Sequence, residues 1–480
     1  MFKSRNIISA CVISALLSSC ALTNRNINNR HISKSTPASQ FVNGERIVFI
    51  GDSITHGGSY HKNIFLFNAT RYPYKKIRYY NAGISGDTAA GTIKRFDTDV
   101  AIHQPTIATI MLGMNDSNRS LYVTPTQTEA EKKKFLEQQT KTRQTYLKNM
   151  DTLAQKLMSL GSQIIFIKPS IFDQTVKLDS NPLIGLNDEL ANYGEEVAKT
   201  LAPKYKATVV DFQTPMLAVN RMLQAKNPEA TVVGGDRVHP GEKGHLVMAY
   251  GFLKDQKESK YVSNFQIDAE NQRVNKFYQC DLTNKIQITL SSVQFTCQSK
   301  TLPFPIEGAQ TEAATWVSFQ EELNKQFYQV TGLTPGNYAL NIDGVKVGEY
   351  SHIDLATGIN LANNKNTPMY RQALKVKALN DKRAQESNKI RTVAHVHYSM
   401  LADYPNVDKS NVEEVVKALE NHVEKSKGKP WYNYLKSRIS EYQNVIGDID
   451  ESRKNVDKLF DEIYLINQPK IHNWQLSLIK

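Results

Sequence analysis

Five short apolar runs alternate with amphipathic segments between residues 45 and 255, and this alternation limits the possible fold more than any other feature. Each apolar run has the length of a strand, and the segments between the runs have the periodicity of helices. Strands that alternate with helices form a parallel sheet with helices on both faces. The predicted strands are residues 46–50, 76–80, 106–112, 163–167 and 207–211. We therefore expect an α/β domain whose functional residues lie at the carboxyl ends of the strands.

A polar, glycine-rich segment from Gly51 to Gly58 follows the first predicted strand. It places Ser53 at the carboxyl edge of the sheet, where a serine hydroxyl can act as a nucleophile if a base removes its proton. A serine at such a position is also a common N-cap of the next helix. The segment by itself leaves both interpretations of Ser53 open.

A second polar segment, before the helix predicted at residues 242–253, contains Asp236 and His239. Their spacing lets the carboxylate reach one imidazole nitrogen while the other nitrogen faces Ser53. Each residue alone has a simpler interpretation, since an aspartate often caps a helix and a lone histidine is usually structural. Together with Ser53 they favour a Ser-His-Asp triad.

Two further segments offer hydrogen-bond donors at the same edge of the sheet. Gly86 follows the second predicted strand, and a glycine lets a backbone N–H come close to a developing oxyanion. Asn115 follows the third predicted strand, where its side-chain amide can donate a second hydrogen bond. These two donors supply what a serine nucleophile needs for acyl transfer.

The four segments resemble, in order, the four blocks of the SGNH, or GDSL, hydrolase superfamily. The matching residues are Gly51-Asp52-Ser53, Gly86, Gly113-x-Asn115-Asp116 and Asp236-x-x-His239. The G-x-S-x-G motif of α/β hydrolases does not fit, because Thr55 stands at the position of its second glycine. The resemblance covers residues 45–258 and implies a three-layer α/β/α, flavodoxin-like domain with a parallel sheet.

The resemblance also implies a role for each site residue. Ser53 is the expected nucleophile, His239 the base and Asp236 the acid that orients it. The expected oxyanion hole consists of the Ser53 and Gly86 backbone N–H groups and the Asn115 side chain. No cofactor or metal is expected.

The first 19 residues have the features of a bacterial signal peptide. Two basic residues precede an apolar stretch, residues 7–17, that is too short to span a bilayer. The following Leu17-Ser18-Ser19-Cys20 resembles a lipobox, in which the chain is cut before a cysteine that becomes lipidated. The alternative is an ordinary secretory signal in which Cys20 is incidental. By the same resemblance, Ala21 favours an outer-membrane lipoprotein of the cell envelope, anchored to the membrane.

The positive charge of the chain does not indicate a nucleic-acid partner. The formal net charge is +12, but the Lys and Arg residues are spread along the sequence without basic blocks. An exported protein also rarely meets nucleic acid. We therefore expect no nucleic-acid binding.

Cys280 and Cys297 are the two cysteines outside the signal peptide and lipobox. In an oxidising compartment such a pair is expected to form a disulfide. Two free, buried thiols are the alternative.

The rest of the chain divides by composition. A tether is expected at residues 20–44, a β-rich accessory module at 259–358 and a helical region at 359–480. Asp343-Gly344 predicts a tight hairpin turn within the β-rich module. Ser410 and Glu413 predict a capping box at the start of a helix.

The expected reaction is hydrolysis of a carboxylic ester through an acyl-enzyme. A lipid-anchored, exported enzyme with a β-rich module is most similar to a carbohydrate O-acetyl esterase, so an acetylated glycan is the expected substrate. One alternative is a lysophospholipase, another lipid esterase or a thioesterase. Another is a non-catalytic surface-binding protein on the same scaffold.

Overall fold

The computed structural model describes residues 40–122, 128–429 and 431–479. Its first sheet has five parallel strands in the order β2-β1-β3-β4-β5. The strands are β1 (Arg46–Gly51), β2 (Arg78–Gly83), β3 (Ile107–Met111), β4 (Gln163–Ile167) and β5 (Thr208–Val210). This is the flavodoxin-like order, in which ligands bind where the strand order reverses, here between β1 and β3. The predicted parallel sheet is confirmed.

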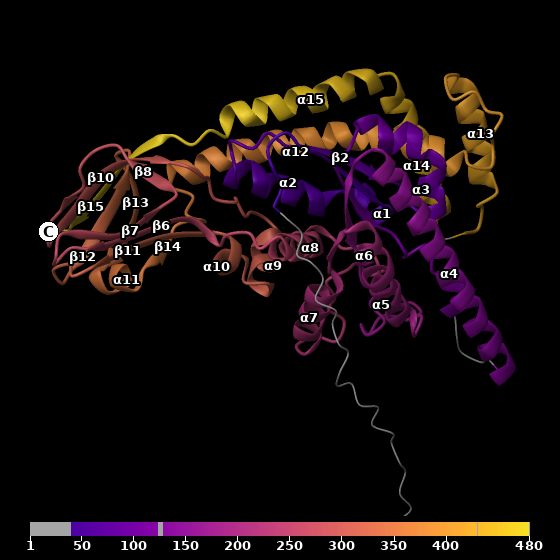
Figure 1. Ribbon diagram of the computed structural model, residues 1–480, viewed down its shortest axis with the longest axis horizontal. Coiled ribbons are helices and arrows are strands. Elements are labelled where there is room, and N and C mark those ends of the chain that lie inside the picture. The colour runs from indigo at the N-terminus through magenta and orange to yellow at the C-terminus, as the bar shows by residue number, and fades with distance from the viewer. Residues whose placement is uncertain (1–39, 123–127, 430, 480) are drawn as a thin grey trace, which may run out of the picture. The chain divides into compact units, whose positions relative to one another are not determined.

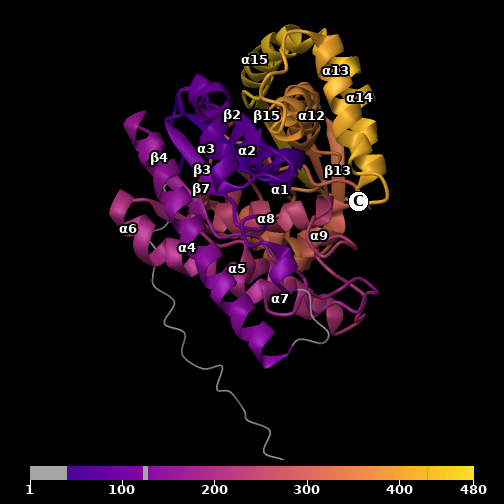
Figure 2. The same ribbon diagram turned by 90° about the vertical axis from the view of Figure 1, so that its right-hand side faces the viewer.

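Strand β1 shows how the sheet separates two hydrophobic cores. Ile47 and Phe49 pack into the core on one face, and Val48 and Ile50 into the core on the other. This division follows from the two-residue period of a strand. The first face carries α1 (Ser53–Gly57), α2 (Ser59–Arg71), α7 (Gln213–Gln224) and α8 (Glu242–Asp255), and the second carries α3 (Ala89–Arg95), α4 (Glu129–Ser159) and α6 (Ala202–Tyr205). Helix α5 (Leu186–Glu196) contributes Leu186 and Leu190 to the first core and Tyr193 to the second. The expected three-layer α/β/α arrangement is confirmed (Figures 1 and 2).

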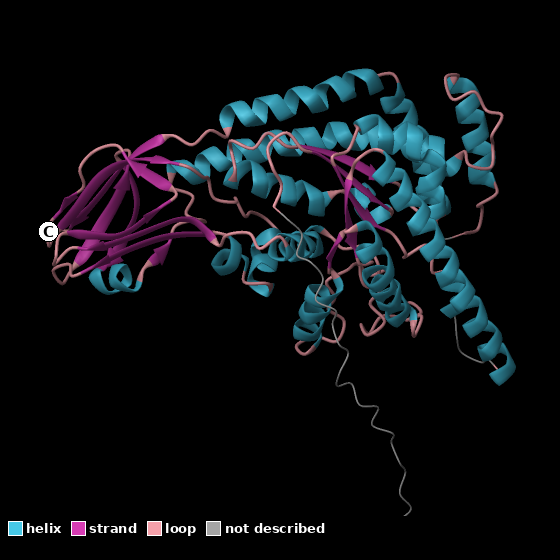
Figure 3. Ribbon diagram, in the orientation of Figure 1, coloured by secondary structure: helices cyan, strands magenta, loops and turns pink. Residues whose placement is uncertain are grey.

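A second group of strands forms two further sheets, visible as the magenta arrows at the left of Figure 3. Their orders are β14-β11-β6-β7 and β13-β12-β15-β10-β8, with β9 paired to β10. Trp474 lies between them: its ring is 5.3 Å from that of Phe265 in the first sheet and 5.6 Å from that of Phe295 in the second. The strands are β6 (Tyr261–Asp268), β7 (Arg273–Tyr278), β8 (Cys280–Leu282), β9 (Gln287–Ile288), β10 (Ser292–Ser299), β11 (Lys325–Thr331), β12 (Asn337–Ile342), β13 (Val345–Ser351), β14 (Ile359–Asn360) and β15 (Ile471–Leu478). Three short helices, α9 (Gln310–Trp316), α10 (Phe319–Leu323) and α11 (His352–Thr357), lie between these strands in the sequence.

The end of the chain returns to the β-rich part. Residues 359–480 were expected to be helical. Four helices lie in this region: α12 (Pro368–His395), α13 (Val412–Glu424), α14 (Tyr432–Ile446) and α15 (Ile449–Ile466). The last described segment, however, is β15, which pairs antiparallel with β10 and β12. Its side chains at 472, 474 and 476 are buried and those at 471, 473 and 475 are exposed, as a half-buried strand requires. The β-rich part therefore includes a strand from beyond residue 358.

Helices α12 and α15 pack against each other, and α12 also contacts α2 and β2 (Figure 1). The capping box predicted at Ser410 and Glu413 is wrong. Asn411 caps α13, because its side chain accepts the backbone N–H of Glu414, while the Ser410 hydroxyl donates to Asp408. An asparagine is as good an N-cap as a serine, so the local sequence offered two candidates one residue apart.

Two short-range features lie in the β-rich part. Cys280 on β8 and Cys297 on β10 are joined in a disulfide, with Cα atoms 5.9 Å apart. Asp343 and Gly344 have φ angles of 53° and 76° and connect β12 to β13. The predicted tight hairpin is confirmed.

The predicted signal peptide, Cys20 and most of the predicted tether lie outside the described residues. Among the helices of the described ranges, none is both long enough and apolar enough to cross a membrane.

Candidate active site

Helix α1 begins directly after β1, and the residue that caps it is Asp52. The Asp52 side chain accepts the backbone N–H of Ile54 at 3.1 Å. Ser53 is the first residue of the helix, and its hydroxyl is not used as the cap. Of the two interpretations that the sequence left open, the N-cap belongs to the neighbouring aspartate.

Two glycines let α1 sit against the ends of β1 and β2. A Cβ atom at Gly51 would overlap the Thr55 side chain, and one at Gly83 would overlap the His56 backbone. Backbone atoms cannot move aside as the end of a flexible side chain can, so Gly83 in particular has no substitute. The close approach fixes the position of Ser53 relative to the sheet.

The structure brings Ser53, His239 and Asp236 together. The Ser53 Oγ and His239 Nε2 atoms are 2.6 Å apart, and His239 Nδ1 is hydrogen-bonded to Asp236 Oδ2. Asp236 Oδ1 accepts the backbone N–H groups of Val238 and His239, both at 3.0 Å. Burial raises the pKa of Asp236, but these hydrogen bonds outweigh it and hold the pKa below its ordinary value. The carboxylate is therefore ionised at neutral pH, as the orienting acid of a triad must be.

Arg237 anchors the loop that carries Asp236 and His239. It has a φ of 68°, and its side chain is 2% exposed. The guanidinium donates to four backbone carbonyl oxygens and to the Ser180 hydroxyl; the carbonyls are those of Asp173, Val176, Leu178 and Ser180. A planar group with five N–H donors is suited to such a site. The side chain between Asp236 and His239 thus ties their loop to the segment that follows β4.

The expected oxyanion donors follow the two strands next to β1. Gly51, at the end of β1, is in register with Gly83 on β2 and Met111 on β3, so the three strands end together. Gly86 lies three residues past the end of β2 and has a φ of 78°, a conformation that favours glycine. A Cβ atom there would meet nothing within 4 Å, so the backbone angle, and not crowding, selects the glycine.

Asn115 connects the loops after β2 and β3. Its Nδ2 donates to the backbone carbonyl of Asp87 at 2.9 Å, and its Oδ1 accepts from Arg119 at 3.5 Å. A side-chain amide has two N–H groups, so the second is free to donate to a substrate oxygen. Asn115 thus holds the Gly86 loop while offering a donor of its own.

Two buried carboxyl groups accompany the site. Burial raises the pKa of Asp52 to about 6 and that of Asp116 to about 7. The hydrogen bond from the Ile54 backbone N–H partly offsets the rise at Asp52, as does the charge of Arg119. The Ala89 backbone N–H donates to Asp116 Oδ1 at 3.0 Å and fixes that side chain under the start of α3.

Comparison with known proteins identifies the family. The GDSL-like lipase/acylhydrolase family matches residues 47–252. A solved structure of a gut microbial diltiazem-metabolizing enzyme is 31% identical, with 92% of this chain and 100% of that chain aligned and a TM-score of 0.81. The chain belongs to the GDSL-like lipase/acylhydrolase family. It is an enzyme that hydrolyses ester bonds.

Other relatives of this GDSL hydrolase align with its first half. Acetylxylan esterase from Geobacillus stearothermophilus is 29% identical over 228 residues, which is 44% of this chain and 94% of that protein. A solved structure of that esterase is 28% identical, covers 45% of this chain and 95% of its own, and has a TM-score of 0.35. The match to the diltiazem-metabolizing enzyme extends well beyond the family region, into the β-rich and helical parts.

Three groups around Ser53 and His239 of this GDSL hydrolase were not expected from its sequence: the Asp52 cap, the Arg237 anchor and His56. Asp52 had a local signal, because aspartate before a helix is a preferred N-cap. Arg237 and His56 had none, since their partners are distant in the sequence.

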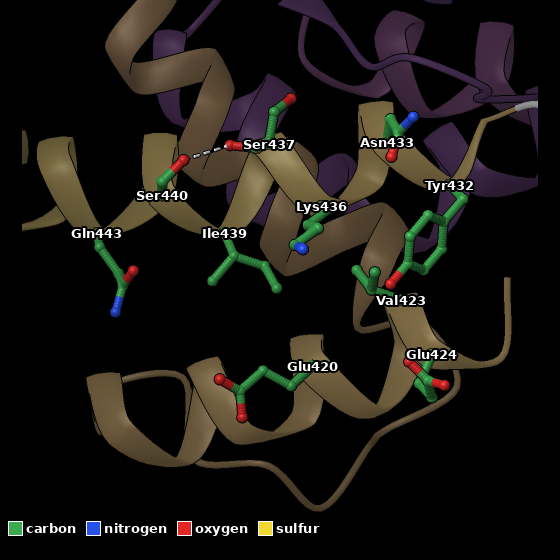
Figure 4. A pocket seen from close by; sticks show the side chains of 10 residues that line it. All are labelled: Glu420, Val423, Glu424, Tyr432, Asn433, Lys436, Ser437, Ile439, Ser440 and Gln443. Atoms are coloured by element: carbon green, nitrogen blue, oxygen red, sulfur yellow. Dashed lines mark hydrogen bonds between the residues drawn. The ribbon is translucent and has the colours of Figure 1, made fainter. Parts of the chain in front are cut away.

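A hollow of about 610 Å³ lies away from the triad, between α13 and α14. Figure 4 shows Tyr432, Lys436 and Ile439 on one wall and Glu420 on the other. None of the predicted site residues lines it.

Proposed function

We propose that this GDSL hydrolase is a serine esterase that removes acetyl groups from carbohydrates through an acyl-enzyme. The observation that carries the proposal is the hydrogen-bonded line from Ser53 Oγ through His239 to Asp236, with a first distance of 2.6 Å. The ionised Asp236 fixes the imidazole so that Nε2 faces the serine as a base. This arrangement activates an otherwise weak nucleophile.

The reaction then proceeds in two steps. His239 takes the proton of Ser53 as its oxygen attacks the ester carbonyl, and the backbone N–H of Gly86 and the amide of Asn115 stabilise the oxyanion. The protonated imidazole then gives its proton to the leaving alcohol. In the second step His239 activates water, which releases acetate and restores Ser53.

Two observations support a small acyl group on a large alcohol. The acetylxylan esterase from Geobacillus stearothermophilus aligns over nearly its whole length. The side chains of His239 and Asp236 are 46% and 52% exposed, so the triad lies at an open surface. An open surface admits a bulky alcohol, whereas a long acyl chain requires an apolar tunnel to remove it from water.

A groove of about 470 Å³ beside the catalytic loop supports the carbohydrate assignment. One wall is formed by Val232, Gly241 and Lys243, on either side of the acid and base in the sequence, and the other by Trp316 of α9. The Lys243 ammonium lies 5.6 Å from the Trp316 ring centroid and pairs with Glu312. An aromatic face beside charged groups offers a sugar ring both apolar contact and hydrogen-bond partners.

The test compares activity on acetylated xylo-oligosaccharides with activity on 4-nitrophenyl acetate, butyrate and decanoate. Diltiazem is included because the relative that matches nearly the whole chain metabolizes it. We expect Ser53→Ala to abolish hydrolysis and Ser159→Ala, at the exposed end of α4, to leave it unchanged. Undiminished hydrolysis by purified Ser53→Ala overturns the proposal, and a preference for decanoate supports a lipid esterase instead.

We also propose that the protein is an exported lipoprotein of the cell envelope, anchored through Cys20, with the outer membrane favoured. The lipobox-like Leu17-Ser18-Ser19-Cys20 supports this proposal. Stable anchoring requires more than one acyl chain, which a lipidated cysteine provides. We expect palmitate labelling and membrane fractionation of the wild type to be lost in Cys20→Ala and retained in Cys11→Ala. Labelling that persists in Cys20→Ala overturns this proposal.

A further inference from the structure

His56 lies in α1, three residues after Ser53, and holds the residue that precedes Gly86. Its Nδ1 accepts the backbone N–H of Ser85 at 3.1 Å and the Ser85 hydroxyl at 3.2 Å. A backbone N–H can only donate, so Nδ1 is unprotonated. Burial, with the nearby charges of His395 and Arg391, holds the pKa of His56 well below its ordinary value, so the ring is neutral.

Asn81, near the end of β2, ties the same two segments together a second time. Its Nδ2 donates to the His56 carbonyl at 3.0 Å, and its Oδ1 accepts the Gly83 backbone N–H at 2.8 Å. The end of α1 and the start of the Gly86 loop are thus held by one side chain. The peptide that presents the Gly86 N–H is fixed from its N-terminal side.

Helix α12 supports this arrangement from far along the sequence. Arg391, 1% exposed, donates to the Asn81 carbonyl at 2.9 Å and makes two hydrogen bonds of 2.8 Å to Asp99. The ring of His395, one turn later, lies edge-to-face with that of His56 at 5.6 Å. The last part of α12 therefore contacts both residues that hold the Gly86 loop.

The network continues on the other side of the loop through Arg95. Arg95 pairs with Asp99 and, at 2.7 Å, with Asp87, and it donates to the Ala82 carbonyl at 2.8 Å. Arg95 and Arg391 share Asp99, and Arg95 also pairs with Asp87, so two buried cations face two carboxylates. Both anions and both cations are hydrogen-bonded, which is the condition for ion pairs to be tolerated in an interior.

We propose that α12 belongs to the catalytic apparatus, and that His56, supported by Arg391, positions the Ser85–Gly86 peptide as an oxyanion donor. The inference rests on the proposed function, because the Gly86 N–H is an oxyanion donor only if the protein is a serine esterase. A donor that acts on the oxyanion contributes in the transition state and little in substrate binding. Misplacing it therefore lowers kcat and leaves KM nearly unchanged.

The test compares His56→Leu, which removes the acceptor, with His56→Asn, whose Oδ1 can replace Nδ1. On 4-nitrophenyl acetate we expect kcat of His56→Leu to fall on the order of 10- to 100-fold, as a small misplacement of a catalytic group does. We expect KM to change little and His56→Asn to recover most of the loss. Arg391→Met is expected to lower kcat in the same way, whereas Arg371→Met, exposed on the first turn of α12, is the matched control. Deleting residues 360–480 is a poorer test, because it removes β15 from its sheet together with α12.

Hydrogen exchange over residues 80–90 gives a readout that does not need activity. We expect the Ser85 amide to lose protection in His56→Leu and to keep it in His56→Asn, with the thermal unfolding midpoint showing that both are folded. Wild-type kcat and protection in His56→Leu overturn the proposal, and so does an equal loss in both variants. If the wild type hydrolyses no ester, the proposed function fails, while the exchange result still decides whether His56 positions the loop.

Discussion

Asp52 caps α1 through its hydrogen bond to the Ile54 N–H, and the adjacent Ser53 hydroxyl is left to pair with His239 at 2.6 Å. A single serine could cap the helix or act as the nucleophile; here Asp52 is the cap and the Ser53 hydroxyl is left for His239. The division matters because a hydroxyl engaged as a cap has its lone pairs occupied by a backbone donor. With the cap supplied by a carboxylate, the hydroxyl is available to its base.

Asp52 predicts a particular dependence of stability on pH. Its folded-state pKa is raised to about 6, above the ordinary value, so the folded chain binds more protons than the unfolded chain between about pH 4 and pH 6. The free energy of unfolding therefore falls through this window as pH rises. Asp52→Asn keeps the cap and removes the titration. We expect the stability of this variant relative to wild type to increase by about 2–3 kcal/mol from pH 4 to pH 7 in urea unfolding. A difference that does not change with pH contradicts the prediction.

Asn115 is expected to act on the oxyanion. Asn115→Ala removes a donor from the transition state, so kcat on 4-nitrophenyl acetate should fall on the order of 100- to 1000-fold. The same change frees the Asp87 carbonyl, so the thermal midpoint is measured alongside. Ser120→Ala, an exposed change nearby, serves as the control. Activity close to wild type in Asn115→Ala removes this residue from the oxyanion hole.

Arg237 is expected to matter for stability and for turnover together. Arg237→Ala leaves several buried carbonyl oxygens without a donor, which should cost about 2–4 kcal/mol in the free energy of unfolding. Because the loop carries Asp236 and His239, kcat should fall as well. Lysine cannot restore the effect, since one ammonium does not reach four carbonyls. Arg221→Ala, at an exposed position on α7, should leave the free energy of unfolding unchanged. Equal free energies of unfolding for Arg237→Ala and Arg221→Ala would show that Arg237 does not anchor the loop.

Trp316 is expected to distinguish glycans from small esters. Trp316→Ala removes the aromatic wall of the groove, so KM for acetylated xylo-oligosaccharides should rise on the order of 10-fold, as when one aromatic contact is lost. Kinetics on 4-nitrophenyl acetate should stay the same, because that ester does not reach the groove. Trp431→Ala, on the exposed surface before α14, is the control. Equal KM values on the oligosaccharide for wild type and Trp316→Ala would show that sugars do not bind there.

The disulfide is expected to stabilise the β-rich part. It closes a loop with a sequence separation of 17, for which the loss of unfolded-state entropy corresponds to about 3 kcal/mol. The double variant Cys280→Ala/Cys297→Ala should be less stable by that order in urea unfolding. Dithiothreitol should lower the stability of the wild type and leave the variant unaffected. A wild type insensitive to the reductant contradicts this prediction.

Several features were predictable because they depend on residues close together in the sequence. The five parallel strands follow from apolar runs, although β2 begins at Arg78, two residues later than expected. The Asp343-Gly344 turn follows from the positive φ angles that such pairs adopt. The positions of Ser53, Gly86 and Asn115 at one edge follow from the rule that parallel strands end together. Asp236 and His239 were expected beside Ser53 from their spacing in the segment before a helix.

What the sequence by itself determined is therefore the parallel sheet and the edge on which the polar segments lie. Only the tertiary structure decided that β15 lies between β12 and β10, in a sheet whose first strand, β8, begins at Cys280. It also decided that Arg237 holds the loop of Asp236 and His239, and that Arg391 reaches the Asn81 carbonyl. The physical reason is the separation in sequence over which each kind of interaction acts. Periodicity and capping act over a few residues, whereas a buried arginine or an inserted strand takes partners that the folded chain brings close from distant positions.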